Sequence, residues 1–289
     1  MASHKDEAKW DVPEDAVYAD LLARSDLWRG PLVQRAIQAL QLPVGSRGLD
    51  AGCGIGQHTI RLAESVGPDG HVTGVDLSPS FVSCAEGMAE DAGLAPRATF
   101  CVADLNHLPF EDNAFDWLWS ADTVVFGPRD QGYVAEAPEE LLGELARVVR
   151  SGGLLAFAFC AAQNLLPGYP LLEAQLCTAA YAAEPFVQGG KPELHHLRAL
   201  GWLREAGLSS VSSHTVAHDI RAPLDPDLRQ ALVGLLTYRW GSNPLRTLPD
   251  EGRTQHRRIC EETSPEFILG QPDFSTFFTC TVYSGTVGG

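Results

Sequence analysis

The chain lacks the features that direct a protein to a membrane or to a covalently stapled fold. No stretch reaches the roughly 18 consecutive apolar residues that a transmembrane helix requires. Residues 1–10 are polar and lack the apolar core of a signal peptide. The seven cysteines include no Cys-x-x-Cys pair, so neither a disulfide framework nor a metal site is expected. These absences predict a cytoplasmic protein without a membrane span, whose cysteines are mostly small buried apolar residues.

Basic residues are scarce as well. The chain has 21 Lys and Arg against 37 Asp and Glu, a formal net charge of −16 at pH 7. Proteins that bind nucleic acid gather basic side chains to displace counterions from phosphates, so nucleic acid is not an expected partner. The basic group at Arg253, His256, Arg257 and Arg258 is interpreted as a solvated helix face, with a local basic patch as the alternative.

What the chain does have is the composition of a globular protein and an alternation of strand and helix patterns. Its 289 residues are 45% hydrophobic and 20% charged, enough to build a large core. Strands are predicted at 47–51, 70–76, 98–103, 115–121, 154–159, 211–220 and 274–286. Helices are predicted at 13–27, from 31 to about 42, 59–66, 79–92, 138–150, 169–183 and 193–206, with another from 226. Apolar strands that alternate with helices indicate an α/β fold with a parallel sheet covered on both faces.

A glycine-rich turn follows the first predicted strand. In Leu49-Asp-Ala-Gly-Cys-Gly-Ile-Gly56, three glycines alternate after an acidic residue and precede a helix. Glycine permits positive φ and lets a ligand lie against the main chain. Turns that bind dinucleotides read Gly-x-Gly-x-x-Gly, whereas this one reads Gly-x-Gly-x-Gly with Asp50 nearby. The turn therefore suits a cationic ligand better than a pyrophosphate, which disfavours a nicotinamide-dependent oxidoreductase.

Further motifs follow in a fixed order: Val75-Asp-Leu-Ser-Pro79, Ala103-Asp-Leu105, Leu108-Pro-Phe110, Phe115-Asp116 and the segment 145–153. Together with the glycine turn they resemble the class I S-adenosylmethionine-dependent methyltransferases, and among these the ubiquinone/menaquinone C-methyltransferase type. The resemblance covers about residues 45–160 and, more weakly, 192–222 and 272–286. It implies a Rossmann-like, doubly wound, seven-stranded and mostly parallel sheet with an antiparallel last strand and helical cap insertions.

The same resemblance implies an organisation of the chain. A helical lid is expected over 1–44, a core that binds the cofactor over 45–160 and a cap insertion over 161–191. The core then continues over 192–222, a helical cap insertion follows over 223–271, and residues 272–289 carry the last core strand.

S-adenosyl-L-methionine is the implied cofactor, and the residues at or just past the strand ends are assigned to its parts. Asp50 would hold the methionine ammonium, with the carbonyl of Ser120, while Asp76 would accept both ribose hydroxyls. Asp104 would accept from the adenine amino group, Leu77 would pack on the adenine, and Leu105 would contribute its N–H. The full implied set is Asp50, Ala51, Gly52, Cys53, Gly54, Asp76, Leu77, Ala103, Asp104, Leu105 and Ser120. For any single Asp in it, the alternative is a helix cap or an Asx turn.

Methyl transfer from a sulfonium is an in-line displacement that depends chiefly on geometry. A base is needed only if the acceptor must lose a proton. The candidates are His58, His107 and Asp122. Each has an alternative interpretation: His58 as a residue of the cofactor side or a cap, His107 as a solvated loop residue, and Asp122 as a cap.

Aromatic residues outside the core motifs are candidates for the acceptor pocket. Tyr18 and Trp28 lie on the predicted N-terminal helices, and Tyr169 and Tyr238 lie in the two insertions. They indicate a small apolar or aromatic acceptor, with ordinary core packing as the alternative.

The predicted function is therefore methylation of a small molecule. An RNA or protein methyltransferase on the same fold is an alternative, although Ser120-Ala-Asp-Thr123 differs from the Asn/Asp-Pro-Pro-Tyr/Phe motif of enzymes that methylate base amino groups. A non-catalytic module that binds S-adenosylmethionine is a further alternative.

Overall fold

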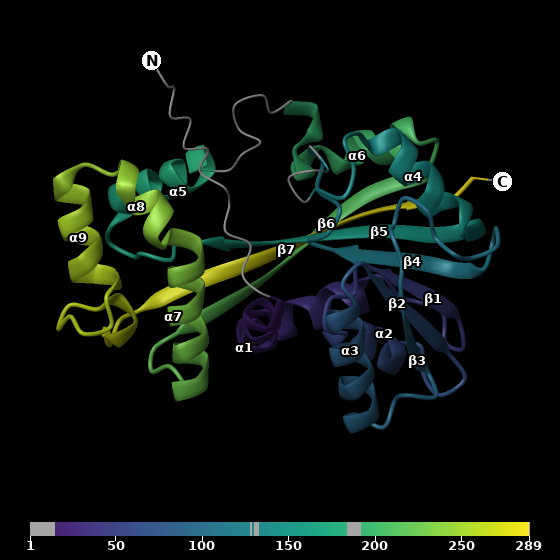
Figure 1. Ribbon diagram of the computed structural model, residues 1–289, viewed down its shortest axis with the longest axis horizontal. Helices are drawn as coiled ribbons and strands as arrows, with labels where there is room; N and C mark the ends of the chain where they lie inside the picture. The colour runs from purple at the N-terminus through teal and green to yellow at the C-terminus, as the bar shows by residue number, and fades with distance from the viewer. Residues whose placement is uncertain (1–14, 128, 130–132, 184–191, 289) are drawn as a thin grey trace, which may run out of the picture. The chain divides into compact units, whose positions relative to one another are not determined.

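A computed structural model describes residues 15–127, 129, 133–183 and 192–288, and its sheet confirms the α/β prediction (Figure 1). Seven strands in these residues lie in the order β3-β2-β1-β4-β5-β7-β6. Strands β1 to β5 pair in parallel, and β7 is antiparallel. The strands are β1 Arg47–Ala51, β2 His71–Asp76, β3 Ala98–Val102, β4 Phe115–Ala121, β5 Val149–Gln163, β6 Ser209–Arg221 and β7 Ser275–Thr286.

The described residues fall into two compact units. The first unit takes residues 15–162, 192–218 and 278–288, and the second unit takes 163–183 and 219–277. The α-helices are α1 Asp15–Ala39, α2 Gln57–Ser65, α3 Pro79–Asp91, α4 Pro138–Arg147, α5 Pro170–Ala183, α6 Ala199–Glu205, α7 Pro226–Trp240, α8 Ser242–Thr247 and α9 Asp250–Cys260. Short 3₁₀ helices are η3 Pro192–Leu194, η4 His196–Arg198 and η5 Ile268–Gly270.

In the first unit, α1, α2 and α3 cover one face of the sheet and α4 and α6 cover the other (Figure 1). Apolar side chains of α4 and α6, among them Leu145 and Trp202, form one buried cluster with Phe157 of β5. Helix α3 begins as predicted, because the Ser78 hydroxyl accepts a hydrogen bond from the Phe81 N–H at 3.3 Å and Pro79 occupies the first turn. In this unit, the local sequence signals and the apolar faces of the helices therefore predict the same elements that the structure has.

One predicted break is wrong. Gly30-Pro31 was expected to separate two helices, but α1 continues through both residues. Proline removes one helical hydrogen bond, to the carbonyl of Leu27. Leu27 is 47% exposed, so water can satisfy that carbonyl. The buried residues Leu32 and Val33 then continue the apolar face of the helix, and packing decides the outcome over local propensity.

The predicted helix 193–206 is wrong in its first half. The chain forms η3 and η4 there, and only α6 is α-helical. The His195 ring accepts a hydrogen bond from the Leu197 N–H at 3.2 Å, and the Trp202 indole donates to the Glu193 carbonyl at 2.7 Å. A continuous α-helix over 193–206 would place these side chains and backbone groups differently, so these two hydrogen bonds favour the 3₁₀ turns.

The second unit is mainly helical. Helix α5 contacts α7, α8 and α9. The Glu173 carboxylate accepts hydrogen bonds from the N–H groups of Leu165 and Leu166 at 2.8 and 3.1 Å, which fixes the turn that precedes α5.

Two expectations extend beyond the described part of the chain: residues 1–14 of the lid and 184–191 of the first cap insertion lie outside it. Among the residues that are described, no helix is long and apolar enough to cross a membrane.

The packing of β1 on β4 gives a test of this fold. A Cβ added to Gly48 would lie 2.0 Å from the ring of Trp117, which is 1% exposed. We expect Gly48→Ala to lower the free energy of unfolding by about 1–3 kcal/mol through overpacking, measured by urea denaturation. Gly143→Ala in α4, where an added Cβ meets nothing within 4 Å, is the matched control and should be neutral or slightly stabilising. Equal stability of both variants would contradict the described packing.

Candidate functional site

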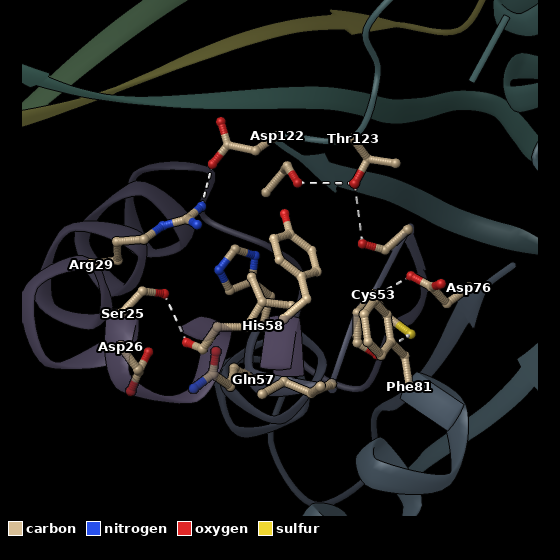
Figure 2. Close-up of a pocket in the computed structure, with 16 residues that line it drawn as sticks. Ser25, Asp26, Arg29, Cys53, Gln57, His58, Asp76, Phe81, Asp122 and Thr123 are labelled. Atoms are coloured by element: carbon tan, nitrogen blue, oxygen red, sulfur yellow. Dashed lines mark hydrogen bonds and ion pairs between the residues drawn. The ribbon is translucent and has the colours of Figure 1, made fainter. Parts of the chain in front are cut away.

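A pocket of about 150 Å³ lies at the carboxyl ends of β1, β2 and β4 (Figure 2). The strand order reverses between β1 and β4, and such a reversal is where open α/β sheets bind ligands. All of its lining residues belong to the first unit. They are Tyr18, Leu22, Ser25, Asp26 and Arg29 of α1, Gly52, Cys53, Gly54 and Ile55 of the turn, Gln57 and His58 of α2, and Asp76, Phe81, Ala121, Asp122 and Thr123.

The glycine turn adopts the conformation that its sequence predicts. Gly52 and Gly54 have φ of +79° and +53°, which residues with a Cβ rarely adopt. A Cβ on Gly52 would lie 2.3 Å from the Thr123 side chain. The N–H groups of Gly52 and Cys53 both donate to the Val75 carbonyl at 2.8 Å. Glycine is therefore required here for the turn to close against the loop after β4.

Asp76 turns its carboxylate toward this turn (Figure 2). One oxygen accepts from the Gly54 N–H at 2.9 Å, and the other accepts from the Ser78 N–H at 3.0 Å. Each carboxylate oxygen can accept a second hydrogen bond. A fixed anion in the pocket wall can therefore bind the hydroxyl groups of a ligand.

Asp50 does not line the pocket, although the sequence assigned it to a ligand ammonium. It is buried, and its carboxylate accepts a hydrogen bond from the Thr59 hydroxyl at 2.6 Å. Burial, with a smaller contribution from Asp76, raises the pKa of Asp50 to about 7 against the lowering effect of the Thr59 bond. Near neutral pH this carboxyl is therefore only partly ionised.

Two further carboxylates line the pocket beside a cation: Asp26, which pairs with Arg61, and Asp122. Arg29 of α1 forms an ion pair with one Asp122 oxygen (Figure 2), and the other Asp122 oxygen accepts from the Cys160 N–H at 2.8 Å. Asp122 has φ of +52°, a strained conformation for a residue other than glycine. Burial alone would lower the pKa of Arg29, but Asp122 and Cys160 outweigh it and raise that pKa, so the guanidinium stays charged.

Arg29 was missed by the sequence analysis. The available signal was a basic residue beside Trp28 on a helix whose next residues are apolar. That pattern alone does not distinguish a buried cation from a solvated one.

His58 lies in the pocket wall as a neutral ring. Burial, together with the positive charges of Arg29 and Arg61, lowers its pKa to about 3. Its ring meets Trp119 edge to face, with centroids 6.2 Å apart. Such a histidine can accept a hydrogen bond but is a weak base.

The residues assigned to the adenine do not line this pocket. Asp104 accepts from the N–H and side-chain amide of Asn106 and pairs with Arg129 at 2.6 Å. Burial opposes the ionisation of Asp104, but these partners outweigh it and lower its pKa. Ala103 and Leu105 are buried, and Leu77 is 68% exposed.

The remaining candidates divide between the core, the surface and the second unit. The Ser120 hydroxyl donates to the carbonyl of Ala51 at 2.6 Å. Trp28 is buried and stacks on Phe278 with centroids 4.6 Å apart, as the core-packing alternative expects. His107 is exposed on the β3–β4 loop, and Tyr169 and Tyr238 belong to the second unit. Of the sequence-predicted residues, the pocket brings together Tyr18, Gly52, Cys53, Gly54, His58, Asp76 and Asp122.

The raised pKa of Asp50 predicts a pH dependence of stability. An unfolded carboxyl titrates near 3.8 and this one near 7, so the native state holds a proton that the unfolded state releases in that window. Stability that Asp50 contributes should therefore fall as pH rises from about 4 to 7. The free energy of unfolding of Asp50→Asn, relative to that of the wild type, should rise by a few kcal/mol, in order of magnitude, between pH 4 and pH 8. Denaturant titrations at each pH measure this difference.

Asp116→Asn is the matched control for this experiment. Burial of Asp116 is outweighed by hydrogen bonds from Arg47 and Arg150, which lower its pKa. The difference in free energy of unfolding between Asp116→Asn and the wild type should stay constant between pH 5 and 8. A constant offset for Asp50→Asn as well would contradict the raised pKa.

Comparison with known proteins agrees with this geometry. A family model described as "Methyltransferase domain" matches residues 43–202. The chain is 33% identical over 128 residues to methyltransferase GfsG of Streptomyces halstedii, which covers 44% of this chain and 42% of that protein. It is 28% identical over 208 residues to the demethylmenaquinone methyltransferase of Bacillus pumilus, covering 68% of this chain and 82% of that protein.

Among solved structures, the YcgJ protein of Bacillus subtilis shares the fold, with a TM-score of 0.53 at 16% identity over 90% of this chain and 99% of that one. The chain spans less than half the length of several of the curated relatives, GfsG included. The family model, by contrast, takes in more than half of this chain and contains the glycine turn, Asp76 and Asp122. The chain therefore belongs to the family of proteins with a methyltransferase domain.

Proposed function

We propose that this protein is an S-adenosylmethionine-dependent methyltransferase that acts on a small apolar or aromatic molecule by in-line methyl transfer. The observation that carries the proposal is the Asp76 carboxylate, held by the Gly54 N–H at the edge of the pocket. A ribose has two neighbouring hydroxyl groups, and such a carboxylate can accept a hydrogen bond from each of them at the same time. A small acceptor is supported by the name of the Bacillus pumilus relative, a demethylmenaquinone methyltransferase.

The charges of the pocket fit the two ends of this cofactor. Asp76 lies on the side of β2, where the nucleoside would bind. Arg29 and Asp122 place a cation and an anion on the side of α1 and β4, which complements an amino acid with its carboxylate and ammonium. Asp122 would thus take the role that the sequence gave to Asp50. Leu77, Ala103, Asp104 and Leu105 would receive the adenine beyond Asp76.

Binding would require the α1 side of the pocket to move. Pockets that hold ligands of this size measure about 300–1,000 Å³, and this one measures about 150 Å³. Tyr18 and Leu22 of α1 line it. Helix α1, which falls within the N-terminal lid predicted over residues 1–44, would therefore shift to admit the cofactor.

The chain's contribution to the reaction would be orientation and not proton transfer. The cofactor supplies a methyl group on a sulfonium when it is bound. His58 is a weak base because its pKa is about 3, and both oxygens of Asp122 already accept hydrogen bonds. The residues of the pocket would hold the reacting atoms in line and exclude water, which can account for much of the acceleration of such a displacement.

The weakness of His58 as a base also favours a second candidate function, a non-catalytic module that binds S-adenosylmethionine. The two functions differ in turnover. An assay of methyl transfer across a panel of quinone, phenol and isoprenoid acceptors separates them, because only the enzyme would release S-adenosylhomocysteine.

Loss of the Asp76 carboxylate should abolish tight binding of the cofactor. We expect Asp76→Ala to weaken the affinity for S-adenosylhomocysteine about 100-fold, since two hydrogen bonds to a charged group are lost. Isothermal titration calorimetry measures this change. Asp91→Ala, at the exposed end of α3, is the matched control and should bind as the wild type does. Unchanged affinity of Asp76→Ala would overturn the proposed function.

The assignment of Arg29 to the amino-acid end makes a separate prediction. Arg29→Met should weaken S-adenosylhomocysteine about 10-fold or more, because the ligand carboxylate loses its cation. The affinity for 5′-methylthioadenosine, which lacks the amino-acid group, should not change. Arg24→Met, at an exposed ion pair of α1, is the control. Equal losses for both ligands would show that Arg29 acts through the fold and would contradict its assignment.

A further inference from the structure

Two cysteines lie opposite each other on neighbouring strands of the first unit. Strands β5 and β7 are adjacent, and their antiparallel register is fixed by hydrogen bonds that join Val287 to Gly152 and Gly153. Counting forward from Gly153 and backward from Val287 by the same number of residues reaches Cys160 and Cys280. Directly opposed residues in an antiparallel pair have Cα atoms about 4.5–5.5 Å apart.

The two side chains point to the same face of the sheet and interact. Cys280 is fully buried, as is Phe278 two residues earlier on the same side of β7, where it stacks on Trp28. A hydrogen bond with the Cys160 side chain and then burial raise the pKa of Cys280. Cys160 itself is only half-buried. One thiol of the pair is therefore accessible and the other is protected.

The accessible thiol lies beside a cation. Arg29 lies close enough to Cys160 for Cys160 to help raise the pKa of the guanidinium, and the Cys160 N–H donates to Asp122, the ion-pair partner of Arg29. Because Cys160 is half-buried and Cys280 is fully buried, Cys160 is the residue of the pair that meets an oxidant first.

We propose that Cys160 and Cys280 form an oxidisable pair that a peroxide converts to a disulfide. The Cys160 thiolate attacks hydrogen peroxide, which breaks the O–O bond and gives a sulfenic acid and, after protonation, one water. The Cys280 sulfur then attacks the Cys160 sulfur, loses its proton and displaces a second water. Two S–H bonds are broken, one S–S bond forms, and the peroxide accepts both electrons.

The backbone geometry suits this bond. Disulfides join Cα atoms about 4.4–6.8 Å apart, and a directly opposed cross-strand pair falls in that range. The new bond would close a covalent ring from 160 to 280 that contains the described residues of the second unit, 163–183 and 219–277. The inference does not depend on the proposed function, because it concerns the thiols alone.

Counting thiols after oxidation tests the proposal. The reduced full-length protein is treated with hydrogen peroxide, denatured, alkylated with N-ethylmaleimide and weighed by mass spectrometry. Wild type should lose two of its seven reactive thiols, and dithiothreitol should restore them. Peptide mapping should show Cys160 joined to Cys280. Cys280→Ser should lose no thiol as a disulfide, whereas the control Cys177→Ser, in the second unit, should still lose two.

Cys280→Ala serves as a second variant, since it places no hydroxyl at this buried position. A thermal melt under reducing conditions checks that both variants fold. Three results would overturn the proposal: seven titratable thiols after oxidation, equal losses in the Cys280 variants and the wild type, or a disulfide that joins other cysteines, such as Cys53 and Cys101. Failure of cofactor binding would leave the thiol counts unchanged, so the two proposals fail separately.

Discussion

The carboxylate of Asp122 is the point at which three elements of the first unit are held together. One oxygen pairs with Arg29 of α1, and the other accepts the N–H of Cys160 on β5, while the residue itself follows β4. The Arg29 side chain is 17% exposed and that of Asp122 is 32% exposed. Removing one partner of such a pair leaves a poorly solvated charge, which costs more than the intact pair contributes. The positive φ of Asp122 is retained because these contacts determine it.

The contacts of Asp122 also determine the shape of the pocket. The loop that carries Asp122 continues to Thr123, whose hydroxyl donates to the carbonyl of Gly52 at 3.2 Å. The glycine turn is thereby fixed against the end of β4, and Asp76 is fixed against the turn through Gly54. Charged groups from the ends of β2 and β4 and from α1 meet in one cavity because the strand order reverses there. The proposed cysteine pair adjoins this ion pair, since the Cys160 N–H donates to the Asp122 carboxylate.

The sequence predicted those features whose cause is local. The strands of the core, the positive φ of the glycines and the start of α3 at Ser78 each depend on a few neighbouring residues, and the structure has them. It failed where distant packing outweighs a local preference. Pro31 did not interrupt α1, because the carbonyl it leaves unpaired lies at an exposed position while the next residues are buried. Likewise, the His195 side chain caps η4 within the segment predicted as an α-helix over 193–206.

For the site, the sequence by itself determined the fold family, the glycine turn and the acid at the end of β2, because spacing along one strand-turn-helix unit fixes them. Only the tertiary structure decided which charges share the pocket. Asp50 lies at the end of β1 and Asp122 follows β4, yet the Thr59 hydroxyl donates to the first and Arg29 pairs with the second. The pairing of Cys160 with Cys280 was equally hidden, since it depends on the register of two strands far apart in the chain. Charge pairing and register are set by contacts between distant segments, and no local pattern records them.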